Sequence, residues 1–141
     1  PDGDVGVRAR LLRLGRSGRQ VVAAGSLFSS AVDDDGTICP VGIISGWMPS
    51  AVHPDTGVAL GGRRIPGFTG AIDLVRALHR RVPQVGLIGW DLAIDDQEAA
   101  TVLEWNVGHS GITHSEAMVG PCFLGLGWDR WHLREARLDP Q

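Results

Sequence analysis

GWDLAIDDQEAATVLEWN, residues 89–106, has the pattern of two strands joined by a polar turn. The apolar run of residues 86–94 predicts the first strand, and residues 99–106 predict the returning strand. Residues 95–98 between them are polar and predict the turn. The sequence therefore predicts an antiparallel hairpin that carries acidic residues inside its strands.

Three oxygen-bearing side chains share one face of this predicted hairpin. Side chains alternate across a strand, so Glu104 and Asn106 lie on the same face, and Asp91 joins them if it pairs with Glu104. Carboxylates that lie directly opposite each other repel, and a divalent cation between them would remove that cost. Carboxylate and amide oxygens are the hard ligands that Mg²⁺ takes, usually together with substrate phosphates. A surface hairpin with an acidic polar face is the alternative that these residues leave open.

The other face of the hairpin is apolar enough to form a core. Strand periodicity assigns to it Ile88, Trp90, Leu92, Ile94, Thr101, Leu103 and Trp105. Val102 is assigned to the face of Glu104. A helix is predicted over residues 69–81, because its apolar residues recur at spacings of three and four. Thr69 is expected to cap this helix, Pro83 to follow its end, and its apolar stripe to pack on the hairpin.

Short apolar runs alternate with turns in the rest of the chain. Strands are predicted over residues 5–14, 20–28 and 37–45, and a short terminal helix over residues 128–138. The aspartates of residues 33–35 lack the ligand spacing of a calcium loop and are interpreted as a solvated turn.

HPDTG, residues 53–57, is interpreted as a turn because Pro54 fixes a negative φ and Gly57 supplies a positive one. The alternative is that His53 faces a substrate.

Composition narrows the class of protein. The chain has 141 residues, enough for one domain, and a net charge of −3, with arginine supplying all thirteen basic residues. This charge balance does not indicate a nucleic-acid-binding protein. The two cysteines, Cys39 and Cys122, form no disulfide or zinc pattern. No apolar run of membrane-spanning length and no signal peptide is present, so we expect a cytoplasmic protein with no membrane partner.

Several segments occur in the order found in ATP-grasp ligases. They are HPDTG at 53–57, IPGF at 65–68, the predicted helix, VGLIGWDLAI at 85–94 and LEWN at 103–106. Over most of residues 7–115 the chain resembles the sugar-transfer-associated ATP-grasp group, which is related to D-alanine–D-alanine ligase and glutamate ligases. The resemblance implies an α+β fold, the C-terminal subdomain of an ATP-grasp enzyme, with an antiparallel sheet packed against one or two helices. Complete ATP-grasp enzymes are longer, so we expect residues 1–141 to be the C-terminal portion, with the N-terminal nucleotide-binding half as its missing partner.

The resemblance also implies roles for residues of the hairpin. Asp91, Glu104 and Asn106 are implied as ligands of Mg²⁺, and Leu103 as an apolar contact to adenine. ATP and Mg²⁺ are therefore the expected cofactors.

Other site residues are expected outside the hairpin. Arg8, Arg13 and Arg64 are candidates for phosphate contacts, because guanidinium groups bind phosphate oxygens bidentately. The alternative for them is a solvated strand edge or loop. Gly111 and Ser115 are candidates for a substrate-binding turn, although the sequence lacks the proline that D-alanine-type ligases place after the metal-binding asparagine.

Two histidines follow the hairpin on a predicted loop. His109 and His114 are open to three interpretations: metal ligands, an acid–base pair, or polar loop residues.

The implied activity is ATP-dependent activation of a carboxylate as an acylphosphate, followed by attack of an amine or, less often, a thiol. Its partner is a small-molecule substrate that carries a carboxylate. The sequence contains no Ser/His/Asp or Cys/His constellation that would supply a nucleophile of its own. The rival hypothesis is a non-catalytic ATP-grasp-like module that binds a ligand or partner without turnover, and the absence of lysine slightly favours it.

Overall fold

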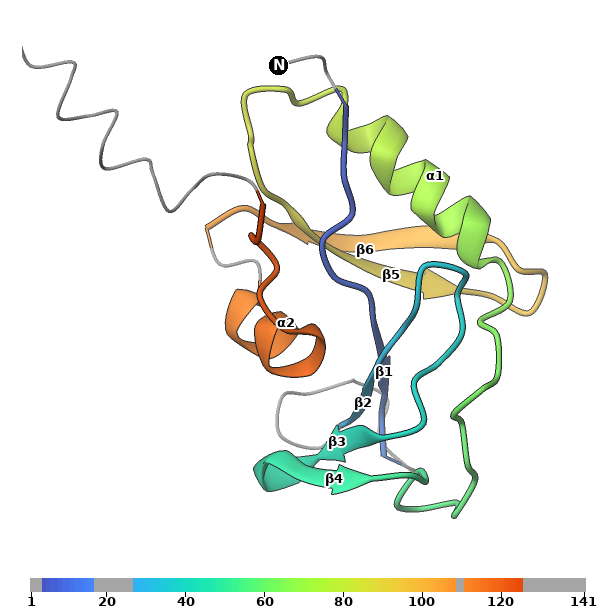
Figure 1. Cartoon of the computed structure of the whole chain (residues 1–141). Helices are drawn as coiled ribbons and strands as arrows, with labels where there is room; N and C mark the ends of the chain where they lie inside the picture. The colour runs from blue at the N-terminus through green and yellow to red at the C-terminus, as the bar shows by residue number, and fades with distance from the viewer. Residues whose placement is uncertain (1–3, 17–26, 109–110, 126–141) are drawn as a thin grey trace, which may run out of the picture.

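The computed structural model describes residues 4–16, 27–108 and 111–125 (Figure 1). Its elements are β1 (Leu11–Leu14), β2 (Phe28–Ala31), β3 (Gly42–Ile44), the 3-10 turn η1 (Ser45–Trp47), β4 (Met48–Ser50), α1 (Phe68–His79), β5 (Gly89–Ile94), β6 (Ala100–Asn106) and α2 (Ile112–Val119). The predicted α+β class, with antiparallel strands and helices packed on them, is confirmed. The strands form two sheets, a four-stranded one in the order β1-β2-β3-β4 and the hairpin β5-β6.

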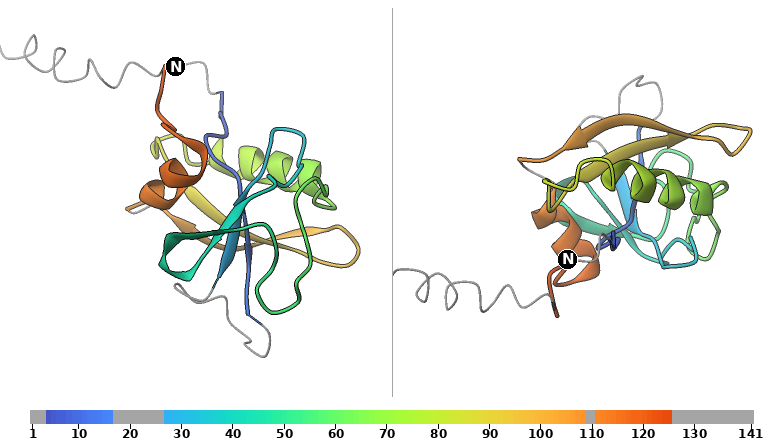
Figure 2. Two further views of the ribbon diagram at one scale, coloured as in Figure 1. Left: turned by 60° about the horizontal axis from the view of Figure 1, so that its bottom comes forward. Right: turned by 90° about the horizontal axis from the view of Figure 1, so that it is seen from above.

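The two helices lie on opposite sides of β1 (Figures 1 and 2). Helix α1 runs along the β5-β6 hairpin and contacts both of its strands. Helix α2 packs against β2 of the larger sheet. Neither helix in the described part of the chain is long and apolar enough to span a membrane.

The core is centred on β2 and not on the apolar face of the hairpin. All residues of β2 are buried, from Phe28 to Ala31, so both faces of this short strand are covered. The strand β3 approaches β2 closely at Gly42, where a Cβ would collide with the backbone carbonyl oxygen of Ser29 and with the ring of Phe28. The other buried apolar side chains are Leu27, Val32, Ile38, Ala71, Val75, Ile88 and Cys122.

The predicted hairpin is present, and a β-bulge divides it. Asp91 pairs with Glu104 as predicted, but the next pair is Leu92 with Val102, so Leu103 has no partner on β5. Residues that pair across an antiparallel ladder share a face, and one extra residue therefore exchanges the faces beyond it. Val102 lies with Leu92 on the apolar face and not with Glu104. The core expected from strict alternation is wrong at Thr101, Leu103 and Trp105, which are exposed.

Helix α1 begins one residue earlier than predicted, and its N-cap is Gly67 and not Thr69. Gly67 has a φ of 66°, in the left-handed region that glycine adopts without steric cost. A Cβ at this position would also collide with the backbone carbonyl of Glu98 in the hairpin turn. This close backbone approach fixes the start of α1 against the turn that joins β5 to β6.

The remaining elements are shorter than predicted. Residues 5–14 contribute only β1, and residues 37–45 contribute β3. Most of the predicted strand 20–28 and the predicted helix 128–138 lie outside the described residues. Residues 33–36 form the predicted turn, closed by a hydrogen bond of 3.0 Å from the Gly36 amide to the Asp33 carbonyl.

The HPDTG turn ties the end of β1 to the loop after β4. The ring of His53 is buried, and its Nε2 lies 3.0 Å from the carbonyl oxygen of Gly15. Its Nδ1 accepts a hydrogen bond of 3.4 Å from the Asp55 amide, so Nε2 carries the proton and donates to Gly15. Arg16 forms an ion pair with Asp55 in the same turn. His53 therefore has a structural role, as the turn interpretation predicts.

Gly67→Ala tests the contact between α1 and the hairpin. We expect a loss of about 2 kcal/mol or more in the free energy of unfolding, because alanine in the left-handed region costs about 1–2 kcal/mol before any collision is counted. Urea unfolding measures the change. Gly70→Ala is the matched control, since Gly70 lies within the helix with open space around it. The free energy of unfolding of that variant should rise by roughly 0.5–1 kcal/mol because alanine has the higher helix propensity. An equal loss in both variants would refute the proposed close contact between Gly67 and the hairpin turn.

His53→Ala tests the HPDTG tie. Loss of the buried hydrogen bond to Gly15 and of the ring contact with Phe28 should lower the free energy of unfolding by about 1–3 kcal/mol. Thr56→Ala removes an exposed side chain of the same turn and should change it by less than about 0.5 kcal/mol. Urea titration of the two variants measures both values, and similar small losses would show that His53 does not anchor β1.

Candidate functional site

The carboxyl groups of Asp91 and Glu104 lie in hydrogen-bonding contact on one face of the hairpin. Asp91 is half-buried on β5, and Glu104 is exposed on β6 directly opposite it. The Asn106 side-chain amide donates a hydrogen bond of 3.2 Å to Oε1 of Glu104. The structure therefore brings together the three residues for which the resemblance implied a metal.

The two acids differ in the strength with which each holds a proton. Burial raises the pKa of Asp91, and the hydrogen bond to Glu104 raises it further. The pKa of Glu104 is lowered, first by the hydrogen bond from Asn106 and then by the one from Asp91. The surroundings therefore favour a proton on Asp91 over one on Glu104.

Arg13 of β1 supplies the positive charge nearest to this pair. Its guanidinium lowers the pKa of Glu104 and opposes the rise in the pKa of Asp91. Arg13 is exposed, so this charge is also accessible to an anion. Arg13 is thus the predicted phosphate-binding arginine that the fold places beside the acids.

The chemistry of this cluster fits a small divalent cation. It offers two carboxyl groups in contact with each other and an amide, which are oxygen donors of the kind Mg²⁺ takes. A cation between the two carboxyl groups would relieve the repulsion of their charged forms. Within the described ranges, no group of three His, Cys, Asp or Glu side chains is placed to hold a metal. Asp91, Glu104 and Asn106 are thus the residues of this cluster that could contact a cation.

A pocket of about 190 Å³ lies beside Arg13, between the four-stranded sheet and α2. Arg13 pairs with Ser29, and Ser29 with Ile43, so these side chains form a row on one face of the sheet. Trp47 and His114 close the pocket, with ring centroids 5.4 Å apart.

His114 lies in the first turn of α2, and its surroundings disfavour the charged imidazolium. Burial lowers the pKa of His114, and the charge of Arg13 lowers it further. Its Nε2 is buried without a hydrogen-bond partner among the described residues. The pocket therefore has a neutral imidazole beside a guanidinium.

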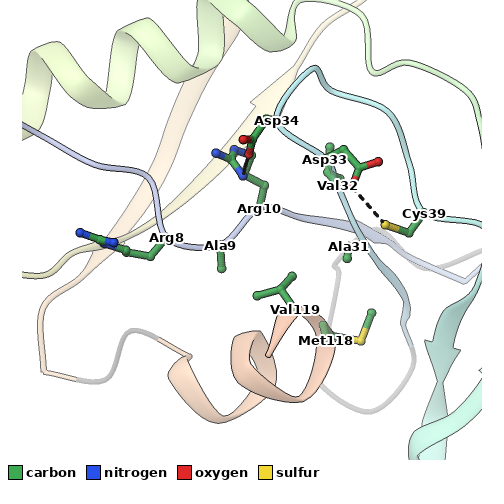
Figure 3. A pocket seen from close by; sticks show the side chains of 10 residues that line it. All are labelled: Arg8, Ala9, Arg10, Ala31, Val32, Asp33, Asp34, Cys39, Met118 and Val119. Carbon is green, nitrogen blue, oxygen red and sulfur yellow. Dashed lines mark hydrogen bonds and ion pairs between the residues drawn. The ribbon is translucent and has the colours of Figure 1, made fainter. Parts of the chain in front are cut away.

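A larger pocket, of about 550 Å³, lies at the other end of α2 (Figure 3). Arg8 lies at the edge of this pocket. Arg10, which also lines the pocket, forms an ion pair of 2.6 Å with Asp34. Ala9, Ala31 and the last turn of α2 form its apolar floor. Arg8 thus lines a different pocket from Arg13, so the two predicted phosphate contacts are not brought to one site.

The other predicted site residues have local partners. The guanidinium of Arg64 donates to the carbonyl oxygen of Asp35 at 2.6 Å, so it supports the turn of residues 33–36. Gly111 is the N-cap of α2, with a φ of 68°, and its carbonyl accepts the Ser115 amide at 3.0 Å. Leu103 is the bulged residue and is 66 % exposed, so it is available for an apolar contact. His109 lies outside the described residues.

The sequence analysis did not identify Trp47 as a candidate site residue. It placed His114 in a loop, whereas the structure places it in α2. Gly46-Trp47 carries no spacing signal for a site, because the tip of the β3-β4 hairpin reaches α2 only in the folded chain. A helix with a partly buried first turn was also not expected after Asn106.

One family model matches the chain. The family is described as sugar-transfer associated ATP-grasp, and the match covers residues 2–121. No curated protein and no solved structure matched the chain significantly.

The environment of His114 predicts a pH dependence of stability. Its folded-state pKa is lowered by burial and by Arg13, so its contribution to stability is present above the unfolded pKa and is lost as pH falls through the folded one. We expect the wild type to lose more unfolding free energy than His114→Gln when the pH is lowered from 7.5 to 5. Urea unfolding at both values measures this difference.

The NMR titration of the His114 ring supplies an independent check. Its midpoint should lie below the ordinary histidine value of about 6.5 and should rise in Arg13→Gln, because Arg13 contributes to the shift. An unchanged midpoint in that variant would show that Arg13 does not affect the pKa of His114.

Proposed function

The chain belongs to the sugar-transfer associated ATP-grasp family, and on that premise we propose that it forms one wall of the catalytic cleft of an ATP- and Mg²⁺-dependent carboxylate–amine ligase. Family membership indicates an ATP-dependent, ligase-like function. The observation that carries the finer proposal is the contact of Asp91 with Glu104, joined by Asn106 and faced by Arg13. The second wall, with further phosphate contacts, would come from the preceding half of the catalytic unit.

Each residue of the cluster has a role in this reaction. Asp91, Glu104 and Asn106 would hold Mg²⁺, which neutralises charge on the transferred phosphoryl group when bound. The guanidinium of Arg13 would orient the terminal phosphate through paired N–H donors. Leu103, exposed at the bulge, would contact the adenine ring.

The reaction needs orientation and charge more than a protein nucleophile. A substrate carboxylate oxygen attacks the terminal phosphorus of ATP, the bond to the bridging oxygen breaks, and ADP leaves. The amine then attacks the acyl carbon of the acylphosphate, loses a proton, and displaces phosphate to form the amide. Burial raises the pKa of the thiols of Cys39 and Cys122, so neither is a ready thiolate that would compete as nucleophile.

Paramagnetic NMR with Mn²⁺ and ATP tests the metal site. Mn²⁺ should broaden the amide signals around Asp91 and Glu104 selectively, and Asp91→Asn combined with Glu104→Gln should weaken this effect at least about tenfold. Asp96→Asn is the matched control, because it removes one exposed carboxylate from the turn of the same hairpin. Equal broadening in all three proteins would place the metal elsewhere.

Release of ADP separates the ligase from the non-catalytic module. The assay uses this chain together with the rest of its catalytic unit and a panel of small carboxylates. The ligase predicts ADP formation that depends on a carboxylate and is lost in the Asp91→Asn, Glu104→Gln protein. Selective Mn²⁺ broadening without any ADP formation would instead favour the binding module.

A further inference from the structure

The pocket beside Arg13 has an apolar body and a polar end. Leu27, Ile43 and Ile44 supply aliphatic surface from the sheet, and Trp47 supplies an aromatic wall. Arg13 and His114 are its cationic and imidazole groups. A volume of about 190 Å³ suits a group the size of a single ring.

Trp47 is held in an unfavourable backbone conformation at this pocket. Its φ is 63°, in the left-handed region, where a bulky side chain is an outlier. The preceding Gly46 has a φ of 75°, so the 3-10 turn at the tip of the β3-β4 hairpin turns through two left-handed residues. The indole remains 57 % exposed and rests on His114, so burial in the core does not compensate for this conformation. Strain of this kind persists where surrounding contacts demand a particular placement of a side chain, commonly at binding sites.

The polar end of the pocket is formed by Arg13, which lines it and is exposed. Its guanidinium presents several N–H donors in a fixed plane. Paired N–H groups of this kind match the two oxygens of a carboxylate. Nε2 of His114, by contrast, is buried and has no surface open to the pocket.

We propose that this pocket binds the carboxylate substrate, and that the substrate is a small acid whose carboxylate is attached to an aromatic or compact apolar group. The carboxylate accepts hydrogen bonds from the guanidinium N–H groups of Arg13. The apolar group packs between the indole of Trp47 and the aliphatic side chains of the sheet.

The lining favours an apolar group over a polyhydroxylated one. The side-chain hydroxyls of the pocket are those of Ser29 and Ser45, and the remaining surface is largely aliphatic or aromatic. Each sugar hydroxyl buried there without a partner would lose its hydrogen bonds to water. A ring without hydroxyl groups loses none.

Arg13 connects this pocket to the acid pair. It lines the pocket, and its charge also acts on Asp91 and Glu104. One guanidinium therefore lies between the proposed phosphate site and the proposed carboxylate site, the arrangement that transfer of a phosphoryl group to a carboxylate oxygen requires. The role of this carboxylate as substrate rests on the proposed function, but its binding to the pocket does not.

Binding of phenylacetate without nucleotide tests the pocket directly. Indole and amide signals in ¹H–¹⁵N spectra should shift at Trp47 and around His114, with a Kd on the order of 1 mM for so small a ligand. Gluconate should bind at least about tenfold more weakly, because its hydroxyls have few partners. Adenosine should not compete with phenylacetate. Competition by adenosine, or gluconate binding as tight as phenylacetate, would overturn the proposal.

Two variants test whether a loss of binding is due to the pocket itself and not to a general effect of removing an arginine. Arg13→Gln should weaken phenylacetate binding at least about tenfold, as expected for loss of a charged hydrogen-bond partner. Arg81→Gln removes an exposed arginine beyond the end of α1 and should leave binding unchanged. Equal effects of these two substitutions would overturn the proposal.

Trp47 offers a second variant that does not depend on Arg13. Trp47→Gly should abolish detectable binding while leaving the Tm equal or higher, because glycine relieves the left-handed conformation. Trp47→Phe should retain most of the binding. Unchanged binding in Trp47→Gly would refute the aromatic wall. Phenylacetate binding in a protein that fails the Mn²⁺–ATP test would overturn the ligase proposal alone, and the reverse result would overturn this inference alone.

Discussion

The contact between the carboxyl groups of Asp91 and Glu104 is the constraint on which the site depends. Two acids held opposite each other on adjacent strands are unfavourable unless they share a proton, bind a cation or face a positive charge. Partial burial raises the pKa of Asp91, and Arg13 of the other sheet supplies a positive charge that acts on both acids. The proposed cation and phosphate would both use these surroundings.

The position of Arg13 depends on a tie at the end of its own strand. His53 and Asp55 of the HPDTG turn bind Gly15 and Arg16, directly after β1. The turn is distant in sequence from both β1 and the hairpin, yet it fixes the strand that carries the guanidinium. A motif on which the resemblance to the family rested thus has a structural role here, at the end of the strand that carries Arg13.

Features that depend on neighbouring residues could be predicted from the sequence, and features that depend on contacts between distant segments could not. The hairpin and its turn were predicted correctly because alternation and turn composition are local properties, and the pairing of Asp91 with Glu104, on which their shared face depended, is present in the structure. The bulge at Leu103 was not, since a single extra residue leaves no mark in composition but exchanges the faces of Val102 and Thr101. The start of α1 was misplaced by one residue, because the capping rule that favours Thr69 does not include the hairpin turn lying against Gly67.

The sequence by itself determined the α+β class, the acidic hairpin and, through ordered motifs, the family, because these follow from periodicity and residue type. Only the tertiary structure decided which arginine meets the acids. Arg13 and Arg8 are chemically equal in the sequence, but Arg13 lies on β1 and Arg8 precedes it, and the fold places them at different pockets. The tertiary structure also brought Trp47 onto His114, whose buried Nε2 has no partner among the described residues. The physical reason is that a pocket is a property of surfaces from separate segments, and their meeting depends on the loop geometry and core packing of the whole chain.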